Sequence, residues 1–196
     1  MTSEPSAAPP LRRRGERMRQ AVLAAAVELL SSQGLAGATV SAVARAAGVH
    51  ETSVYRRWGT RENLILDALN TQLDSALPVP DTGCVRDDLL GFFSSLAALL
   101  GTAQGHALLR IGVEHDDTLE DRRGPYWSDR LDRAVVMVRR GIERGELAAD
   151  TDPGLLIEAV SGPLFVRALL SGAPLDEALV RRLVDLALDG ARPRPA

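Results

Sequence analysis

The sequence predicts an all-α fold of about nine helices, arranged as a small N-terminal domain followed by a larger helical one. Three observations predict it. Apolar residues recur at helical spacing along most of the 196 residues, the alternating pattern of a half-buried strand does not occur, and glycines stand singly at helix ends and turns. With 45% hydrophobic and 25% charged residues, the composition is that of an ordinary soluble globular protein.

Charge is distributed unevenly along the chain. The formal net charge is −3, and all 23 basic residues are arginine. Residues 1–70 carry nine arginines against six acids, whereas residues 71–196 carry fourteen arginines against twenty acids. A basic N-terminal part followed by an acidic remainder predicts that the N-terminal part binds a polyanion and that the remainder has another function.

The first four helices are delimited by residues that start or stop a helix. Thr39 and Thr60 are good N-caps, Gly34 and Gly48 are good terminators, and Pro78 breaks the fourth helix. We therefore expect helices from Arg17 to Gly34, from Val40 to Gly48, over the segment ETSVYRRW, and from Thr60 to Leu77.

The remainder of the chain reads as helices almost throughout. Asp152 followed by Pro153 is a helix-start signal, because proline is tolerated in the first turn. The expected helices are Val85–Leu100, Ala103–Glu114, Tyr126–Arg144, Gly154–Leu170 and Leu175–Asp189.

The two ends and the compartment follow from composition. The segment MTSEPSAAPP and the final RPRPA have no apolar periodicity, so we expect residues 1–14 to form a disordered basic arm and the last residues to be disordered. Cys84 is the single cysteine, which excludes an intrachain disulfide and a cysteine-based zinc site and favours a reducing cytoplasm. The apolar run AVLAAAVELL is too short for a signal peptide, and no segment approaches 18 uninterrupted apolar residues.

Residues 39–58, TVSAVARAAGVHETSVYRRW, have the outline of a helix-turn-helix. Apolar residues around the turn at Gly48 are spaced to lock the two helices together: Val43, Ala47, Val49 and Val54. The outward side chains are then Glu51, Thr52, Ser53 and Arg56. Arginine can bond guanine bidentately, hydroxyls can reach base edges or phosphate, and a glutamate can accept from cytosine.

A second group of side chains suits phosphate contacts that fix register. Its members are Thr39, Arg45, Tyr55, Arg57, Thr60 and Arg61. Five arginines at positions 12, 13, 14, 17 and 19 form an arm that either reaches a minor groove or neighbouring phosphates, or only keeps a solvated flank soluble.

Residues 17–66 resemble the DNA-binding domain of the tetracycline-repressor (TetR) family of bacterial regulators. The resemblance is carried by the amphipathic first helix, a Thr-Val start to the second, and the phrases AVARAAGV, TSVYRRW and TRENLI at consistent spacing. It implies a DNA-binding domain at residues 15–62, base contacts from Thr52, Ser53 and Arg56, and backbone contacts from Thr39, Tyr55 and Arg61. His50-Glu51 stands where the family often has Ser-Lys, so that Glu51 either reads a base or weakens phosphate attraction, and Gly59 stands where proline is common.

Residues 71–196 resemble the family's helical C-terminal domain less specifically, and we expect the regulatory and dimerisation domain to span residues 63–192. Leu155–Leu170 is apolar on nearly every side, and such a helix must be covered all round. The final expected helix carries apolar residues at neighbouring positions: Leu179, Val180, Leu183, Val184, Leu186 and Ala187. The family implies a four-helix dimer interface here. A two-fold dimer would set two recognition helices roughly 34–36 Å apart on a palindromic operator.

The resemblance also implies an apolar effector cavity in this domain. The large side chains that would shape it are Phe92, Phe93, Trp127 and Phe165, whose alternative is an ordinary core role. Possible polar anchors are Arg110 and Arg167, and His106 either lines the pocket or is an ordinary hydrogen-bonded histidine.

The sequence lacks the patterns of an enzyme or metalloprotein. No GxSxG, Walker-type or dinucleotide-binding pattern occurs, and the acidic stretch Glu114–Asp117 has no known metal-ligand spacing, so we expect no catalysis, metal or cofactor. The function expected is sequence-specific transcriptional regulation by a cytoplasmic homodimer, most simply a repressor released by a small molecule. The alternatives are a DNA-binding regulator controlled by a protein partner, and an enzyme on a borrowed helical scaffold.

Overall fold

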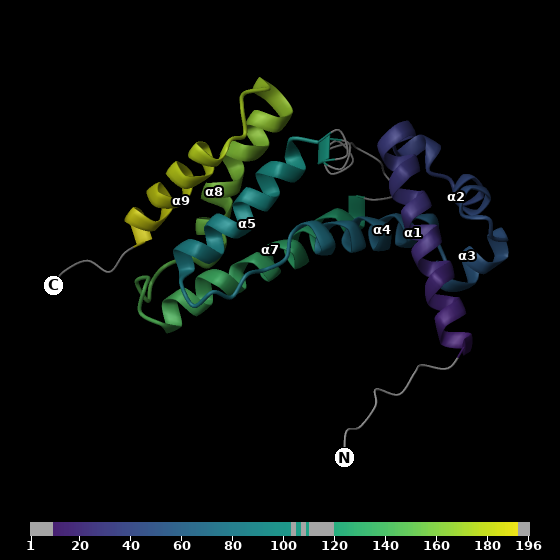
Figure 1. The fold of residues 1–196 in the computed structure, drawn as a ribbon, viewed down its shortest axis with the longest axis horizontal. Helices are drawn as coiled ribbons and strands as arrows, with labels where there is room; N and C mark the ends of the chain where they lie inside the picture. The colour runs from purple at the N-terminus through teal and green to yellow at the C-terminus, as the bar shows by residue number, and fades with distance from the viewer. Residues whose placement is uncertain (1–9, 103–104, 107–108, 110–119, 192–196) are drawn as a thin grey trace, which may run out of the picture. The chain divides into compact units, whose positions relative to one another are not determined.

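The computed structural model is all-α in the ranges it describes, which are residues 10–102, 105–106, 109 and 120–191 (Figure 1). These ranges contain helices and connecting loops but no strand, which confirms the predicted fold class. The elements are α1 (Pro10–Gly37), α2 (Val40–Ala47), α3 (Glu51–Trp58), α4 (Arg61–Ala76), α5 (Val85–Leu100), α7 (Glu120–Glu143), α8 (Pro153–Val166), the π-helical turn η1 (Arg167–Ser171) and α9 (Glu177–Ala191).

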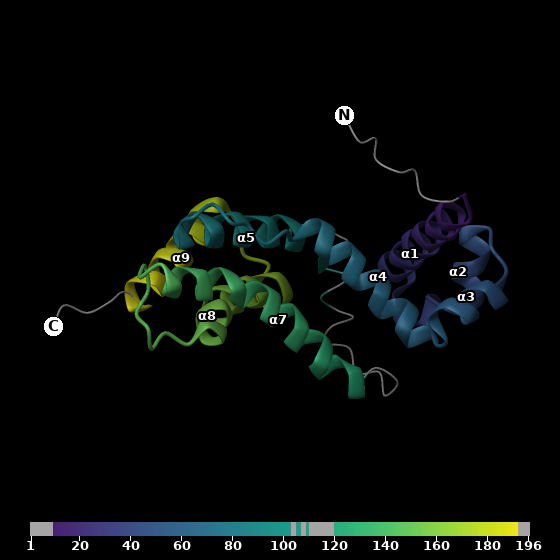
Figure 2. The same cartoon turned by 90° about the horizontal axis from the view of Figure 1, so that it is seen from below.

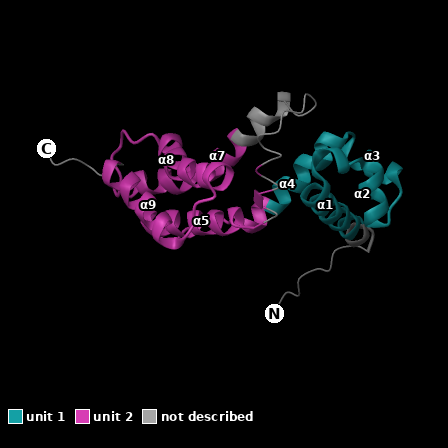
Figure 3. Ribbon diagram, turned by 90° about the horizontal axis from the view of Figure 1, so that it is seen from above, with its two compact units in different colours: residues 1–72 teal, residues 73–196 magenta. Residues whose placement is uncertain are grey.

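The chain divides into two compact units, residues 1–72 and residues 73–196 (Figure 3). The division falls within α4, between Gln72 and Leu73, so this one continuous helix contributes residues to both units.

Helix α1 begins earlier than the sequence led us to expect. It starts at Pro10, so residues 10–14 are helical and the predicted disordered arm over residues 1–14 is wrong for this part. Proline fits the first turn of a helix, and leucine and arginine are strong helix formers, which accounts for the extension. Near the other end Gly34 adopts a φ of 68°, which interrupts the helical backbone where the sequence predicts the stop.

The helix-turn-helix forms as predicted. The Oγ1 atom of Thr39 accepts a hydrogen bond from the backbone N–H of Ala42 at 3.1 Å and caps α2. Gly48 ends α2 with a φ of 67°, and its N–H donates to the carbonyls of Ala44 and Arg45. Val43 and Val54 are buried and Ala47 and Val49 pack at the edge of the same cluster, so the predicted locking residues meet.

Helices α1, α2, α3 and the first part of α4 share one apolar core in the first unit. Within this unit α2 packs against α1, and α3 packs against α2 (Figure 2). The most deeply buried members of the core are Val22, Ala26, Val43, Ala44, Val54, Leu64 and Ala68.

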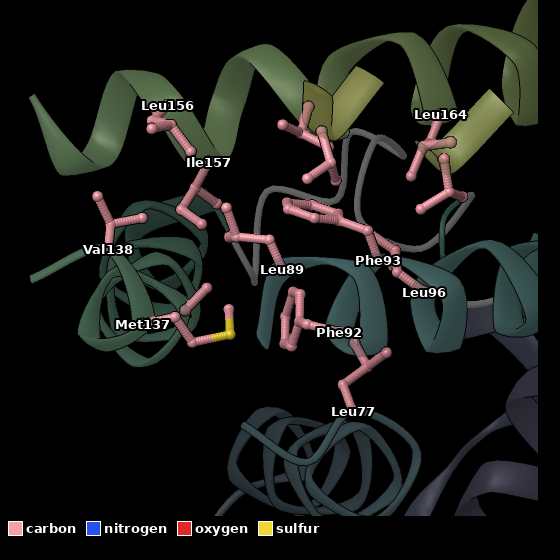
Figure 4. Packing of buried hydrophobic residues seen from close by; sticks show 14 of the residues in the cluster. Leu77, Leu89, Phe92, Phe93, Leu96, Met137, Val138, Leu156, Ile157 and Leu164 are labelled. Carbon is pink, nitrogen blue, oxygen red and sulfur yellow. The ribbon is translucent and has the colours of Figure 1, made fainter. Parts of the chain in front are cut away.

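The second unit is built around a separate core from α5, α7, α8 and α9 (Figure 4). Phe93 is fully buried at its centre and packs edge-to-face on Phe92, with ring centroids 5.4 Å apart. The surrounding buried side chains include Leu89, Met137, Val138, Val160, Leu164 and Val180.

Helix α8 ends before the Leu170 boundary expected from the sequence. Its α-helical part stops at Val166, and η1 continues to Ser171. The N–H of Gly172, which has a φ of 62°, donates to the carbonyl of Arg167 at 2.9 Å and closes this wider turn.

The stretch from α8 through η1 is apolar yet poorly covered. Residues 153–171 contain an 18-residue window with a mean hydropathy of 1.5 and are long and apolar enough to cross a membrane by length and composition alone, which the sequence analysis did not anticipate. Glu158 and Arg167 interrupt the stretch, and its buried residues Leu156, Ile157 and Leu164 pack in the core. The opposite side of the stretch is exposed, with Leu155 at 63% and Leu170 at 81% exposure. One side of the stretch therefore packs in the core, while its other side is an uncovered apolar face.

Candidate nucleic-acid interface

Helix α3 presents one polar face outward because its other face is fixed in the core. Val54 and Trp58 are buried at 1% and 7% exposure. Glu51, Thr52 and Arg56 are exposed. The remaining predicted contacts on this helix are half-buried Ser53 and exposed Tyr55 and Arg57. An eight-residue helix with this division can lie in a major groove while its apolar side stays packed.

Helices α2 and α4 each begin at an N-terminus capped by a threonine. Thr39 caps α2 as described, and the Oγ1 atom of Thr60 accepts from the backbone N–H of Asn63 at 3.2 Å at the start of α4. The first N–H groups of a helix attract anions such as phosphate. Thr39 and Thr60 are both exposed, as is Arg45 in the last turn of α2.

Glu51 has a structural explanation besides the two roles weighed from the sequence. It lies in the first turn of α3, where a negative charge is favourable because the N-terminus of a helix carries partial positive charge. His50 at the N-cap makes no side-chain capping bond, so Glu51 supplies the favourable group at this end.

Gly59 shows why this chain departs from a proline at the turn after α3. Its φ is 74°, whereas the proline ring holds φ near −65°. The backbone path between α3 and α4 is therefore one that proline is unable to follow.

Arg61 has an internal role that the sequence analysis missed. Its Nε donates to the carbonyl of Ala38 at 3.0 Å, and its Nη2 donates to the carbonyl of Leu35. Both carbonyls lie after the break at Gly34, and that of Leu35 also accepts from the backbone N–H of Ala38 at 3.2 Å. The sequence analysis assigned Arg61 only to phosphate, and this half-buried guanidinium also holds the connection between α1 and α2.

A cluster of polar contacts around Trp58 was also missed. The indole Nε1 donates to Oδ2 of Asp67 at 2.9 Å, and Nδ2 of Asn63 donates to the carbonyl of Trp58 at 2.8 Å. The guanidinium of Arg57 lies over the Trp58 ring, 5.6 Å from its centroid. The sequence offers little signal for this cluster, because Trp58 and Asp67 belong to different helices separated by a turn.

Arg19 differs from the role expected for the arginine arm. Its Nη2 donates to Oδ1 of Asp67 at 2.7 Å and to Oγ1 of Thr71 at 3.2 Å. The hydrogen bond that Arg19 donates to Asp67 is the main cause that raises the pKa of Arg19 above its ordinary value. Arg19 thus fastens α1 to α4, while the side chains at 12, 13 and 14 lie outside the described residues.

The residues expected to shape an effector cavity do not stand out as a site. Phe92 and Phe93 are buried core, Phe165 packs at its edge, and His106 is exposed. Nη1 of Arg167 donates to the carbonyl of Pro174 at 2.8 Å. The side chains of Arg110 and Trp127 and the acidic stretch at 114–117 lie outside the described residues, and within the described ones no three His, Cys, Asp or Glu side chains are grouped as metal ligands.

Models of known protein families match both units of the chain. The family model "Bacterial regulatory proteins, tetR family" matches residues 22–68, and the model "Tetracyclin repressor-like, C-terminal domain" matches residues 79–187. The chain belongs to the TetR family. It is therefore a DNA-binding transcriptional regulator and not an enzyme, and regulators of the TetR family bind operator DNA as dimers.

Individual TetR-family relatives agree along nearly the whole chain. The HTH-type transcriptional regulator AqdR of Rhodococcus erythropolis is 35% identical over 179 residues, covering 90% of this chain and 86% of that protein. The DNA-binding transcriptional repressor TetR of Mycobacteroides abscessus is 34% identical over 178 residues, covering 88% of this chain and 92% of that one. The crystal structure of the TetR family transcription regulator SCO0332 superimposes with a TM-score of 0.72 at 29% identity, covering 90% of this chain and all of that chain.

Proposed function

We propose that this chain is a cytoplasmic homodimeric repressor that binds a palindromic operator and leaves it when a small molecule binds. The observation that carries the proposal is the outward polar face of α3, with Arg56 and Thr52 exposed opposite the buried Val54 and Trp58. A relative in Mycobacteroides abscessus, 34% identical, is a transcriptional repressor, which supports the sign of regulation.

In this proposal residues 15–62 read DNA. Arg56 contacts guanine bidentately, and Thr52 and Ser53 contact base edges. The groups that hold the phosphates are Thr39, Arg45, Tyr55, Arg57 and Arg61. The guanidinium of Arg61 holds a phosphate while it also bonds the connection between α1 and α2. Glu51 stabilises the N-terminus of α3 and faces the groove.

Residues 63–192 join two chains and receive the effector. The exposed apolar side chains of α8, η1 and α9 support pairing of two copies, because large apolar side chains are stabilised when they are buried against another apolar surface. They are Leu155, Val166, Leu169, Leu170 and Leu186. Pairing by a two-fold axis would present two α3 helices to successive major grooves.

Release requires that the effector bind one arrangement of the dimer better than the other. The element we propose to change is α4, since it belongs to both units. On the second-unit side, Asp74 accepts from Nη1 of Arg130 and from Nη1 of Arg133, the latter at 2.7 Å. An effector held among Phe92, Phe93, Phe165 and Trp127, with His106 and Arg110 as polar partners, would act on α7 and through these arginines on α4.

The test is a titration of the purified protein against the DNA that flanks its coding region, in parallel with unrelated DNA, at two salt concentrations. Binding that persists at high salt only on the flanking DNA is the expected result, because specific contacts add to the salt-sensitive phosphate term. Equal and equally salt-sensitive binding to both DNAs contradicts an operator in this region. The specific complex then supplies the assay for small molecules, and release by a purified protein instead would favour the partner-controlled alternative.

A further inference from the structure

The last residue of the reading helix is held at two points by one face of α4. Asn63 donates from Nδ2 to the carbonyl of Trp58 at 2.8 Å, and Asp67 accepts from the indole Nε1 of Trp58 at 2.9 Å. Asn63 and Asp67 are four residues apart, so they lie on the same side of the helix. The backbone and the ring of Trp58 are therefore both fixed to α4.

The second oxygen of Asp67 is also used. Its Oδ1 accepts from Nη2 of Arg19 in α1 at 2.7 Å, and this arginine reaches Thr71 one turn further along α4 at 3.2 Å. The carboxylate thus joins three helices, with an ionic partner on one oxygen and the indole on the other. Hydrogen bonds to an ionised group are stronger than neutral ones, and both contacts are partly buried.

Helix α3 depends on this anchor because it has few others. It is eight residues long, and its buried side chains are Val54 and Trp58. Apolar packing by a valine is not directional, so it sets the depth of the helix more firmly than its rotation about its own axis. The two hydrogen bonds of Trp58 are directional and fix that rotation.

We infer that Asp67 is a positioning residue that sets the rotation of α3, and hence the aim of Thr52 and Arg56, through the indole N–H of Trp58. The same ring holds the guanidinium of Arg57 5.6 Å from its centroid, so that Arg57 is placed by the anchor as well. This inference rests on the proposed function, since it names the residue that aims its reading helix.

The experiment uses three single variants of the full chain and the double variant Trp58→Phe/Asp67→Asn. Trp58→Phe keeps a large buried ring and removes the indole donor, and Asp67→Asn keeps an oxygen acceptor and removes the charge. Val22→Ala is the matched control, because it opens space in the same core without touching any of these polar groups. For each variant we would measure affinity for flanking and unrelated DNA, thermal unfolding, and amide hydrogen exchange across residues 51–58.

The expected result separates aim from stability. Trp58→Phe should lower affinity for the flanking DNA by about tenfold, the effect of one charge-assisted hydrogen bond, and change affinity for unrelated DNA by less than about twofold. The double variant should bind no more weakly than the weaker single one, since the two residues act through one contact. Exchange in α3 should accelerate in Trp58→Phe and Asp67→Asn beyond Val22→Ala at matched loss of thermal stability.

Two outcomes overturn the inference. One is a ratio of flanking to unrelated affinity that falls equally in Trp58→Phe and Val22→Ala, since a purely structural role predicts this. The other is unchanged exchange in α3 in both Trp58 and Asp67 variants. If wild-type protein binds both DNAs equally, the proposed operator fails, and hydrogen exchange alone still decides whether Asp67 positions α3.

Discussion

The two units of this chain expose opposite kinds of surface. Among the described side chains of the first unit, residues 15–72, the large apolar ones are buried or half-buried, and the large exposed side chains of α3 are charged or, in Tyr55, amphipathic. In residues 73–196 the α8, η1 and α9 segments leave leucines uncovered, among them Leu170 at 81% and Leu186 at 73% exposure. The first surface suits a charged, hydrated partner and the second suits another apolar surface, so one chain is built for two different associations.

The strongest test of this contrast is a charge on the apolar surface. Leu186→Glu should convert a dimer into a monomer at micromolar concentration and weaken operator binding by about a hundredfold or more, because burying an unpaired charge in each copy costs several kcal/mol. Sedimentation velocity and DNA titration measure the two effects. Val79→Glu is the control, since Val79 is exposed but lies outside α8, η1 and α9. A dimer that survives Leu186→Glu would remove this surface as the interface.

A second test removes one charge from the reading face. Arg56→Ala should cost about 1–3 kcal/mol in affinity for the operator and relax its base preference, because a bidentate contact to guanine is lost. Affinity for unrelated DNA should change little. Arg139→Ala removes an exposed arginine from α7 instead and should leave the preference intact. Equal losses on operator and unrelated DNA for Arg56→Ala would exclude base reading by this side chain.

A third test separates folding from phosphate binding. Arg61→Ala should lower the free energy of unfolding by about 1–3 kcal/mol, because two carbonyls at the end of α1 lose a charged donor. It should also weaken binding to all DNA sequences alike. Arg45→Ala serves as the comparison, since Arg45 is exposed on α2 and should affect DNA binding without a comparable loss of stability. Urea titration measures the free energy of unfolding. An unchanged value in Arg61→Ala would show that the internal contacts of Arg61 are dispensable.

The smallest expected effect concerns acid sensitivity of the second unit. Burial acts to raise the pKa of Glu146, but the N–H of Val85 and the guanidinium of Arg144 outweigh it and hold that pKa below the ordinary 4.5. The resulting stability is present above about pH 4.5 and is lost as the pH falls through the lower folded-state value.

Glu146→Gln should therefore flatten the fall of the melting temperature between about pH 6 and 3 and cost less than about 1 kcal/mol near neutrality. Thermal unfolding over a pH series measures this. Glu143→Gln, a change at an exposed acid of α7, is the control and should keep the wild-type slope. A Glu146→Gln slope equal to wild type would contradict a depressed pKa at Glu146.

The sequence was informative where function depends on local pattern. Thr39 and Gly48 mark a cap and a left-handed turn through residue type alone, and the outward residues of α3 follow from which neighbours are apolar. The helical start at Pro10 was missed because a segment rich in proline, serine and alanine without apolar periodicity resembles a disordered tail, although proline also fits a first helical turn.

Contacts between separate helices could not be predicted from the sequence, for a physical reason. The meeting of Arg19, Trp58 and Asp67 depends on how three helices cross, and no spacing along one helix encodes this. Arg61 was misjudged in part because an exposed arginine and one that caps carbonyls have the same sequence signature. The sequence left the aromatic residues of the second unit open between core and cavity because apolar side chains serve both, and the structure buries Phe92 and Phe93 in the core.

The central claim is that the apolar surface pairs two chains so that their polar surfaces read one operator together. Its most direct test is native mass spectrometry of the protein with DNA carrying the flanking site and with a half-site of the same sequence. The account predicts a free dimer of twice the 21.0 kDa chain mass and two chains per full site, with much weaker binding to the half-site. A free monomer that binds full and half sites with equal affinity would contradict it.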